Sequence, residues 1–195
     1  YENVNWNLRN QDYLKTNIEI EFDFIVGNPP YLMYQNISLY ERNFIREKFI
    51  SCYKGKFDYC YPFIEKSMSE LKSDSGAMSY LIPTSIFKNV YAEELRNLLK
   101  ENLFEIFDFK TIKVFDDATV SSSIINLSKK KNFPHVTYIN VNKKEEISIN
   151  KSDLKGKWIF SINNDISINK GRRFGDFFKV SNSVATLLNK AFIID

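Results

Sequence analysis

Residues 22–31 read FDFIVGNPPY, and the expected fold follows from this segment. Its first six residues form a short, largely apolar run of the length and composition of a buried strand. Two successive prolines then end the strand, because proline has no N–H group to donate to a neighbouring strand. Asn28-Pro29-Pro30-Tyr31 is therefore predicted to form a rigid loop at the carboxyl end of the strand. In open α/β sheets, ligands bind at that end of the strands.

The sequence that follows alternates between helix-like and strand-like patterns. Apolar residues recur at helical spacing in two segments, 58–72 and 92–100. Short apolar or alternating runs that favour strands occur at 77–82, 104–109 and 120–127. Residues 34–51 are polar with scattered aromatic side chains and show no clean period. This order of elements predicts an α/β fold with a mostly parallel sheet covered by helices.

The character of the chain changes after Lys129-Lys130-Lys131. Short strands are predicted at 135–141 and 146–149, in a context rich in Asn and Lys. From Lys129 onward the chain contains 13 Lys and Arg but 6 Asp and Glu, whereas the preceding residues carry a net charge of −4. Such a basic segment fits a surface that faces nucleic acid, although a merely solvated surface has the same charge. We therefore divide the chain into residues 1–131 and 132–195.

The counts of histidine and cysteine limit the chemistry. His135 is the only histidine, and the two cysteines, Cys52 and Cys60, have no metal-ligand spacing. Zinc sites and Ser/His/Asp triads are therefore excluded, and we expect no bound metal. Two cysteines cannot build a disulfide framework, and no apolar run reaches the length of about 20 residues that a membrane span needs. Both observations favour a cytoplasmic protein that does not enter a membrane.

The loop at residues 28–31 has the groups needed to receive an aromatic amine. The Asn28 side-chain oxygen and the Pro29 carbonyl are two acceptors, which match the two N–H donors of a planar amino group. The Tyr31 ring can lie on the face of the attached ring system. Two acceptors push electron density back onto the amine nitrogen, which favours its attack on a methyl group. The alternative is a proline-stiffened turn without a catalytic role.

Together with three later blocks, this loop resembles the adenine-N6 DNA methyltransferases that use S-adenosylmethionine in type II and type IIG restriction–modification systems. Residues 55–87 are similar to the block that follows the catalytic loop, and residues 114–131 to the block that completes the target-base pocket. Residues 172–195 look like the opening of a target-recognition domain. The resemblance implies site-specific methyl transfer from S-adenosylmethionine to an adenine flipped out of double-stranded DNA.

The resemblance also implies roles at the catalytic loop. Asn28, Pro29 and Pro30 would bind and activate the target amino group. Tyr31 would stack on one face of the flipped base, and Phe115 would stack on the other. Extruding a base costs a few kcal/mol. Two aromatic stacks, each worth roughly 1–3 kcal/mol, can offset that cost.

Further residues would hold the cofactor and the DNA. In Asn10-Gln11-Asp12-Tyr13, Asp12 would accept a hydrogen bond from the cofactor's amino group and Tyr13 would border its adenine ring. Asn28 would also line the cofactor site. The residues expected to contact DNA are Arg172, Arg173 and Lys179.

The family's first cofactor motif, a glycine-rich turn followed by an acidic residue, has no counterpart in the eleven residues before Asp12. The expected fold of residues 1–131 is therefore a partial Rossmann-like S-adenosylmethionine methyltransferase sheet, built from the later strands. Residues 132–195 would form a linker and the start of an α+β target-recognition domain. We expect these 195 residues to be inactive alone and to self-associate through an exposed sheet edge.

Two other functions fit some of the same residues. NPPY loops also occur in methyltransferases that modify protein glutamine or RNA guanine, but those chains usually lack a basic extension like residues 155–195. A partial domain that only binds DNA or a partner is the non-catalytic alternative. Direct binding of the cofactor separates a catalytic role from this last one.

Overall fold

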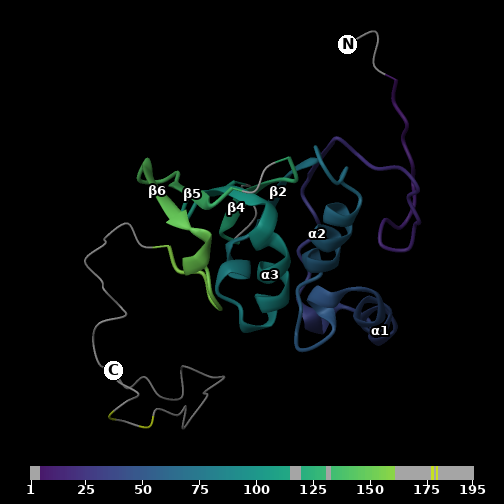
Figure 1. Cartoon of the computed structure of the whole chain (residues 1–195). Coiled ribbons are helices and arrows are strands. Elements are labelled where there is room, and N and C mark those ends of the chain that lie inside the picture. Colours follow the sequence, from purple (N-terminus) through teal and green to yellow (C-terminus); the bar gives the residue numbers. More distant parts are fainter. Residues whose placement is uncertain (1–4, 115–119, 131–132, 161–176, 178, 180–195) are drawn as a thin grey trace. The chain divides into compact units, whose positions relative to one another are not determined.

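The computed structural model describes residues 5–114, 120–130, 133–160, 177 and 179. Within these residues the central feature is a six-stranded sheet with the order β1-β2-β4-β3-β5-β6 (Figure 1). Its strands are β1 (Phe24–Gly27), β2 (Ala77–Pro83), β3 (Leu103–Asp108), β4 (Ser122–Ser128), β5 (His135–Asn140) and β6 (Glu145–Asn150). Each of them coincides with a segment whose sequence pattern predicts a strand.

The sheet is mixed, so the expectation of a mostly parallel sheet is wrong. Among the described strands, only the β1–β2 and β3–β5 pairs are parallel. Strand β4 lies antiparallel between β2 and β3, and β6 pairs antiparallel with β5. The reason lies in the connections, because a parallel neighbour needs a long crossover, usually through a helix. Strands β5 and β6 are joined instead by the short turn at residues 141–144, in which Lys144 has a φ of 56°.

Helices cover one side of the sheet. The helices α2 (Cys60–Ser69) and α3 (Glu93–Asn102) confirm the two predicted from helical spacing, and both lie on the same side of the sheet (Figure 1). The helix α1 (Leu39–Lys48) falls in a segment for which no element was predicted. Its cap is Ser38, whose Oγ accepts a hydrogen bond from the Glu41 N–H at 3.2 Å. The Ser-x-x-Glu pattern marks a helix start even where apolar periodicity is absent.

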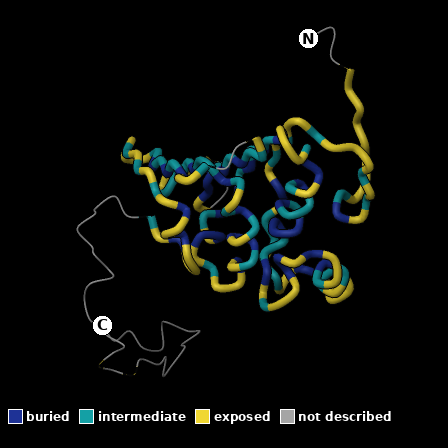
Figure 2. The backbone as a smooth tube through the Cα atoms, in the orientation of Figure 1, coloured by how far each residue is buried: buried dark blue, intermediate teal, exposed yellow. Residues whose placement is uncertain are grey.

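The hydrophobic core lies between the sheet and these helices (Figure 2). Buried residues alternate with less buried ones along β2 and β5, as expected for strands with one face against the core. Strand β1 is an edge strand, and its apolar side chains Phe24 and Val26 are 76% and 82% exposed. Strand β1, which leads into the loop at residues 28–31, thus exposes apolar side chains at one edge of the sheet.

The sheet continues across the division that the sequence places between residues 131 and 132. Strand β5 pairs with β3, and the first compact unit runs from Tyr1 to Ile162. A second unit comprises Asn163–Asp195. The functional division into a catalytic core and a recognition domain therefore stays a prediction, and the structural break lies further along the chain.

The described residues contain no helix long and apolar enough to traverse a bilayer. The same part of the chain holds no group of three or more His, Cys, Asp or Glu side chains that could bind a metal ion.

Candidate active site

The loop at residues 28–31 lies at one edge of the sheet. Strands β1, β2, β3 and β5 run in the same direction, so their carboxyl ends meet at this edge. Strand β1 ends at Gly27, and residues 28–31 continue without regular secondary structure, as the two prolines predict. The loop thus occupies the end of the sheet at which α/β proteins bind ligands.

Within the loop, exposed and buried residues alternate. The Asn28 side chain is exposed and makes no hydrogen bond within the described part of the chain, so its amide oxygen is free to accept one. Pro29 is buried and Pro30 is exposed. Burial of Pro29 anchors the loop, whereas the carboxamide of Asn28 points to where an incoming group can reach it.

Tyr31 is packed partly against the hydrophobic core. Its hydroxyl is buried beside Ser122, the first residue of β4, and burial raises the pKa of the phenol above its usual range. The side chain therefore remains neutral at physiological pH. A neutral ring that packs partly against the core suits a stacking surface better than a proton-transfer group.

A pocket of about 420 Å³ opens beside the loop. It is lined by segments far apart in sequence, namely β1, the loop, α2, β2 and the turn before β1. Its lining includes Tyr13, Gly27, Asn28, Pro29, Pro30, Phe63, Glu70 and Tyr80. The structure therefore brings Tyr13 and Asn28, two of the three predicted cofactor residues, to one pocket, while the lining does not include Asp12 or Tyr31.

The third predicted cofactor residue, Asp12, is engaged within its own turn. Its Oδ1 accepts a hydrogen bond from the Leu14 N–H at 3.1 Å, and its Oδ2 forms an ion pair with Lys15 at 3.0 Å. Lys15 also contacts Glu41 at 2.9 Å. A ligand amino group would therefore have to share Asp12 with Lys15. Asp12 stabilises its own turn, and its contact with the cofactor stays a prediction.

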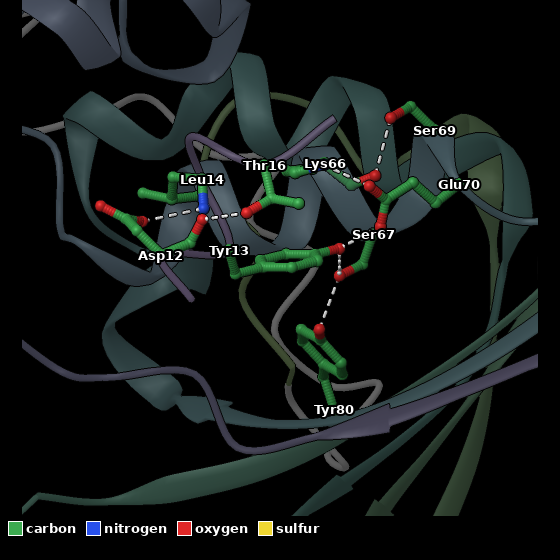
Figure 3. A network of polar contacts seen from close by, with 9 residues as sticks. All are labelled: Asp12, Tyr13, Leu14, Thr16, Lys66, Ser67, Ser69, Glu70 and Tyr80. Atoms are coloured by element: carbon green, nitrogen blue, oxygen red, sulfur yellow. Dashed lines mark hydrogen bonds and ion pairs between the residues drawn. The ribbon is translucent and has the colours of Figure 1, made fainter. Parts of the chain in front are cut away.

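Tyr13 is held by a polar network that sequence reasoning missed (Figure 3). Its ring stacks on Phe63 with centroids 5.7 Å apart, and its hydroxyl contacts Glu70 and, at 2.9 Å, the Ser67 Oγ. Ser67 in turn lies 2.6 Å from the Tyr80 hydroxyl. The periodicity of α2 places Phe63 and Ser67 on its inward face, but nothing local in the sequence shows that Tyr13 meets them.

The positions of the remaining predicted site residues relative to this pocket stay predictions. Phe115, Arg172 and Arg173 lie outside the described residues. Lys179 is described and exposed, and it belongs to the second compact unit. Their roles stay predictions.

With this geometry established, comparisons with known proteins identify the family. The family model of the Eco57I restriction-modification methylase matches residues 1–115, which is more than half of the chain. The chain belongs to this family. The match includes both the Asp12-Tyr13 turn and the loop at residues 28–31, so the pocket lies within the matched part of the chain.

Curated relatives of this Eco57I-family chain are type II methyltransferases. M.HincII of Haemophilus influenzae is 32% identical over 142 residues, covering 71% of this chain and 28% of the relative. RM.Eco57I of Escherichia coli, a restriction enzyme and methyltransferase, is 33% identical over 114 residues, covering 56% of this chain and 11% of the relative. M.AccI of Acinetobacter calcoaceticus is 28% identical over 221 residues, covering 98% of this chain and 40% of the relative. The chain thus spans less than half of these relatives' lengths.

Solved structures agree on the fold of the Eco57I-family chain. The type IIG restriction endonuclease BpuSI matches with a TM-score of 0.57 at 14% identity, covering 74% of this chain and 21% of that one. A Listeria monocytogenes protein described as a class I S-adenosylmethionine-dependent methyltransferase matches with a TM-score of 0.51 at 20% identity, covering 65% and 39%. The mixed α/β sheet is therefore that of the class I methyltransferases.

Proposed function

We propose that the complete methyltransferase to which this chain contributes transfers a methyl group from S-adenosylmethionine to N6 of an adenine flipped out of duplex DNA. The observation that carries the proposal is the exposed carboxamide of Asn28, unpaired within the described residues and fixed beside a buried Pro29 at the pocket. Membership of the Eco57I restriction-modification methylase family supports DNA as the substrate.

The acceptors of the loop account for activation of the amine. The Asn28 Oδ1 and the Pro29 carbonyl each accept one N–H of the target amino group, which raises the electron density on nitrogen. The two acceptors would also hold the amine so that its nitrogen lone pair faces the methyl group that a bound S-adenosylmethionine would supply. The alkylated nitrogen afterwards releases a proton to water, so the step needs no histidine. Both acceptors are preorganised by the two prolines, and such preorganisation is a large source of transition-state stabilisation.

The pocket fits one side of an S-adenosylmethionine site. When bound, this cofactor supplies an electrophilic methyl group on sulfur. The Tyr13 and Phe63 rings provide an aromatic wall, and the Asn28 side chain provides an acceptor in the same pocket. On this proposal, Tyr13 and Phe63 border the adenine ring, while Asn28 lies between the cofactor and the target base.

The base and the DNA backbone would be held from other elements. Tyr31 and Phe115 would stack on opposite faces of the flipped adenine. Arg172, Arg173 and Lys179 would contact phosphates, in keeping with the basic character of the chain from Lys129 onward. Of these residues, Phe115, Arg172 and Arg173 lie outside the described part of the chain.

The choice between DNA and the other substrates of NPPY loops can be tested directly. The complete protein is supplied with S-adenosylmethionine carrying a labelled methyl group and with duplex DNA, RNA and a glutamine-containing release factor in parallel. We expect the label in DNA, because the family and the basic segment both point to it. Label in RNA or protein, with DNA unlabelled, would contradict the proposal.

The 195-residue chain by itself is expected to bind S-adenosylmethionine only weakly. Its pocket provides an aromatic wall and Asn28, but residues 1–11 contain no glycine-rich turn or following acid to hold the ribose and the methionine end. Calorimetric titration of this chain measures the affinity, and a micromolar Kd would show that the site is assembled differently. Sedimentation of the same sample tests whether the exposed β1 edge, with Phe24 and Val26, promotes self-association.

A further inference from the structure

We propose that Ser67, Glu70 and Tyr80 are positioning residues that hold the cofactor turn and the catalytic loop in one fixed geometry. The cofactor turn is residues 12–16 and the catalytic loop is residues 28–31. The inference rests on the proposed function for the meaning of these two segments, but the physical connection between them rests on contacts alone. It assigns a role to three residues outside both motifs.

A continuous hydrogen-bonded chain runs from the cofactor turn to the sheet (Figure 3). The Tyr13 hydroxyl donates to Glu70 Oε2, and the other oxygen of Glu70 accepts from Lys66. The Tyr13 hydroxyl also lies 2.9 Å from Ser67 Oγ, which lies 2.6 Å from the Tyr80 hydroxyl. Ser67, Glu70 and Tyr80 are buried, with exposed fractions of 0%, 7% and 7%.

The direction of each hydrogen bond in this network follows from the single proton that each hydroxyl carries. Burial raises the pKa of Tyr13, with Glu70 adding to the effect, and burial raises the pKa of Tyr80, so both phenols keep their single proton. Because the Tyr13 hydroxyl donates its proton to Glu70, the Ser67 hydroxyl must donate to Tyr13. Ser67 then has no proton left, so Tyr80 must donate to Ser67. Every hydroxyl donates once and accepts at most once, and such one-directional chains strengthen each member and resist rearrangement.

Tyr80, the last residue of the hydrogen-bonded network, contacts Gly27, which precedes the catalytic loop. A Cβ atom placed on Gly27 would lie 2.8 Å from Tyr80 Cε1 and 3.1 Å from Tyr80 Cζ, so the phenol ring rests directly against the Gly27 backbone. The ring cannot turn aside without breaking its hydrogen bond to Ser67. The position of Gly27, and with it that of Asn28, is therefore set by the same phenol whose hydroxyl anchors Tyr13.

Glu70 makes a second connection to β1. Its backbone carbonyl accepts from the Phe22 N–H at 2.8 Å, and the Phe22 carbonyl accepts from the Lys72 N–H at 3.0 Å. The residue that fixes Tyr13 through its carboxylate thus fixes the entry to β1 through its backbone. Tyr13, Gly27, Glu70 and Tyr80 all line the pocket described above. One network thus holds both the cofactor turn and the catalytic loop, which on the proposed function bind the cofactor and the target amine side by side.

Three variants of the complete protein test this inference. Tyr13→Phe and Tyr80→Phe each remove one hydroxyl from the network, and the double variant removes both. We expect each single change to lower kcat/KM for S-adenosylmethionine about tenfold, because small misplacements of reacting groups cost rate steeply. The double variant should lose little more than either single variant, since Tyr13 and Tyr80 are joined only through Ser67.

Tyr138→Phe is the matched control. Tyr138 is a buried tyrosine of β5 whose hydroxyl donates to Asp108 at 2.7 Å, without contact to the network. It should lower stability comparably while leaving kcat/KM for S-adenosylmethionine within about twofold of wild type. Equal losses in Tyr80→Phe and Tyr138→Phe, or additive losses in the double variant, would overturn the positioning role.

Hydrogen exchange on the same proteins separates this inference from the proposed function. Tyr13→Phe should speed exchange at the amides of residues 24–28 as well as in its own turn, although Tyr13 lies more than ten residues away in sequence. Exchange at residues 24–28 that stays at the wild-type rate would contradict the connection. If the wild-type protein methylates no DNA, the proposed function is wrong, but the exchange result still tests the connection between the two segments.

Discussion

Asn28→Ala in the complete methyltransferase is expected to lower the rate of methyl transfer about 100- to 1000-fold, which corresponds to the loss of one preorganised acceptor in the transition state. Binding of S-adenosylmethionine should change little, because the aromatic wall of the pocket is left intact. The variant should also fold normally, since the Asn28 side chain is exposed and makes no hydrogen bond within the described residues. Single-turnover methylation with saturating cofactor measures the effect on the chemical step.

Asn142→Ala provides the matched control for this variant. Asn142 is exposed in the turn between β5 and β6, away from the pocket lining. Its replacement should leave the methylation rate within about twofold of wild type, as surface substitutions usually do. A rate for Asn28→Ala within a few fold of wild type would show that the loop does not activate the amine.

Gly27→Ala is expected to lower the methylation rate about 100-fold, because a shift of the order of 1 Å in a reacting group has that consequence. The added methyl group would lie 2.8 Å from Tyr80 Cε1, well inside contact distance. Tyr80 is held by Ser67, so the backbone of Gly27 has to move and takes Asn28 with it. Steady-state rates at saturating cofactor and DNA report this displacement as a fall in kcat.

A second glycine distinguishes displacement of the loop from a general loss of stability. A Cβ on Gly156 would meet nothing within 4 Å, but Gly156 has a φ of 55°, in the left-handed region that alanine disfavours. Gly156→Ala should therefore cost about 1 kcal/mol of stability without changing kcat. If the two variants lose kcat equally, the contact between Gly27 and Tyr80 does not position the loop.

Local patterns of the sequence predicted most elements of this fold. Strand β1 and its end at the Asn28-Pro29-Pro30 loop follow from an apolar run and the missing proline N–H groups. Helix α2 follows from its 3.6-residue period. Helix α1 was missed because its inward face is weakly apolar, and Ile45 is its one buried residue among those described. The Ser38 and Glu41 pair nevertheless indicates where the helix begins.

Pairing direction and buried polar contacts could not be predicted in this way. The insertion of β4 between β2 and β3 depends on how the chain returns to the sheet, which strand patterns do not encode. Arg96 is 2% exposed and donates to the carbonyls of Ile86, Asn89 and Gly156, the last of them 60 residues away. An arginine in a helix is normally expected to face solvent, and the sequence does not show that distant carbonyls accept its hydrogen bonds.

The candidate site likewise has a part that could be predicted from local sequence and a part that could not. The two acceptors of the loop at residues 28–31 are adjacent in sequence, so the proposed chemistry could be inferred from four residues. The hydroxyl of Tyr13 meets Ser67 across 54 positions and Glu70 across 57, so the network that holds the cofactor turn appears only in the folded chain. Motif spacing predicts which groups react, and tertiary packing determines what keeps them in place.

The most direct test is to identify the methylated nucleoside. The complete protein is expressed in a host without DNA methylation, and its genomic DNA is digested and analysed by mass spectrometry, beside DNA from cells that express Asn28→Ala. The account predicts N6-methyldeoxyadenosine in the wild-type sample and its near absence in the variant. Methylated cytosine in place of methylated adenine, or equal N6-methyldeoxyadenosine in both samples, would contradict it.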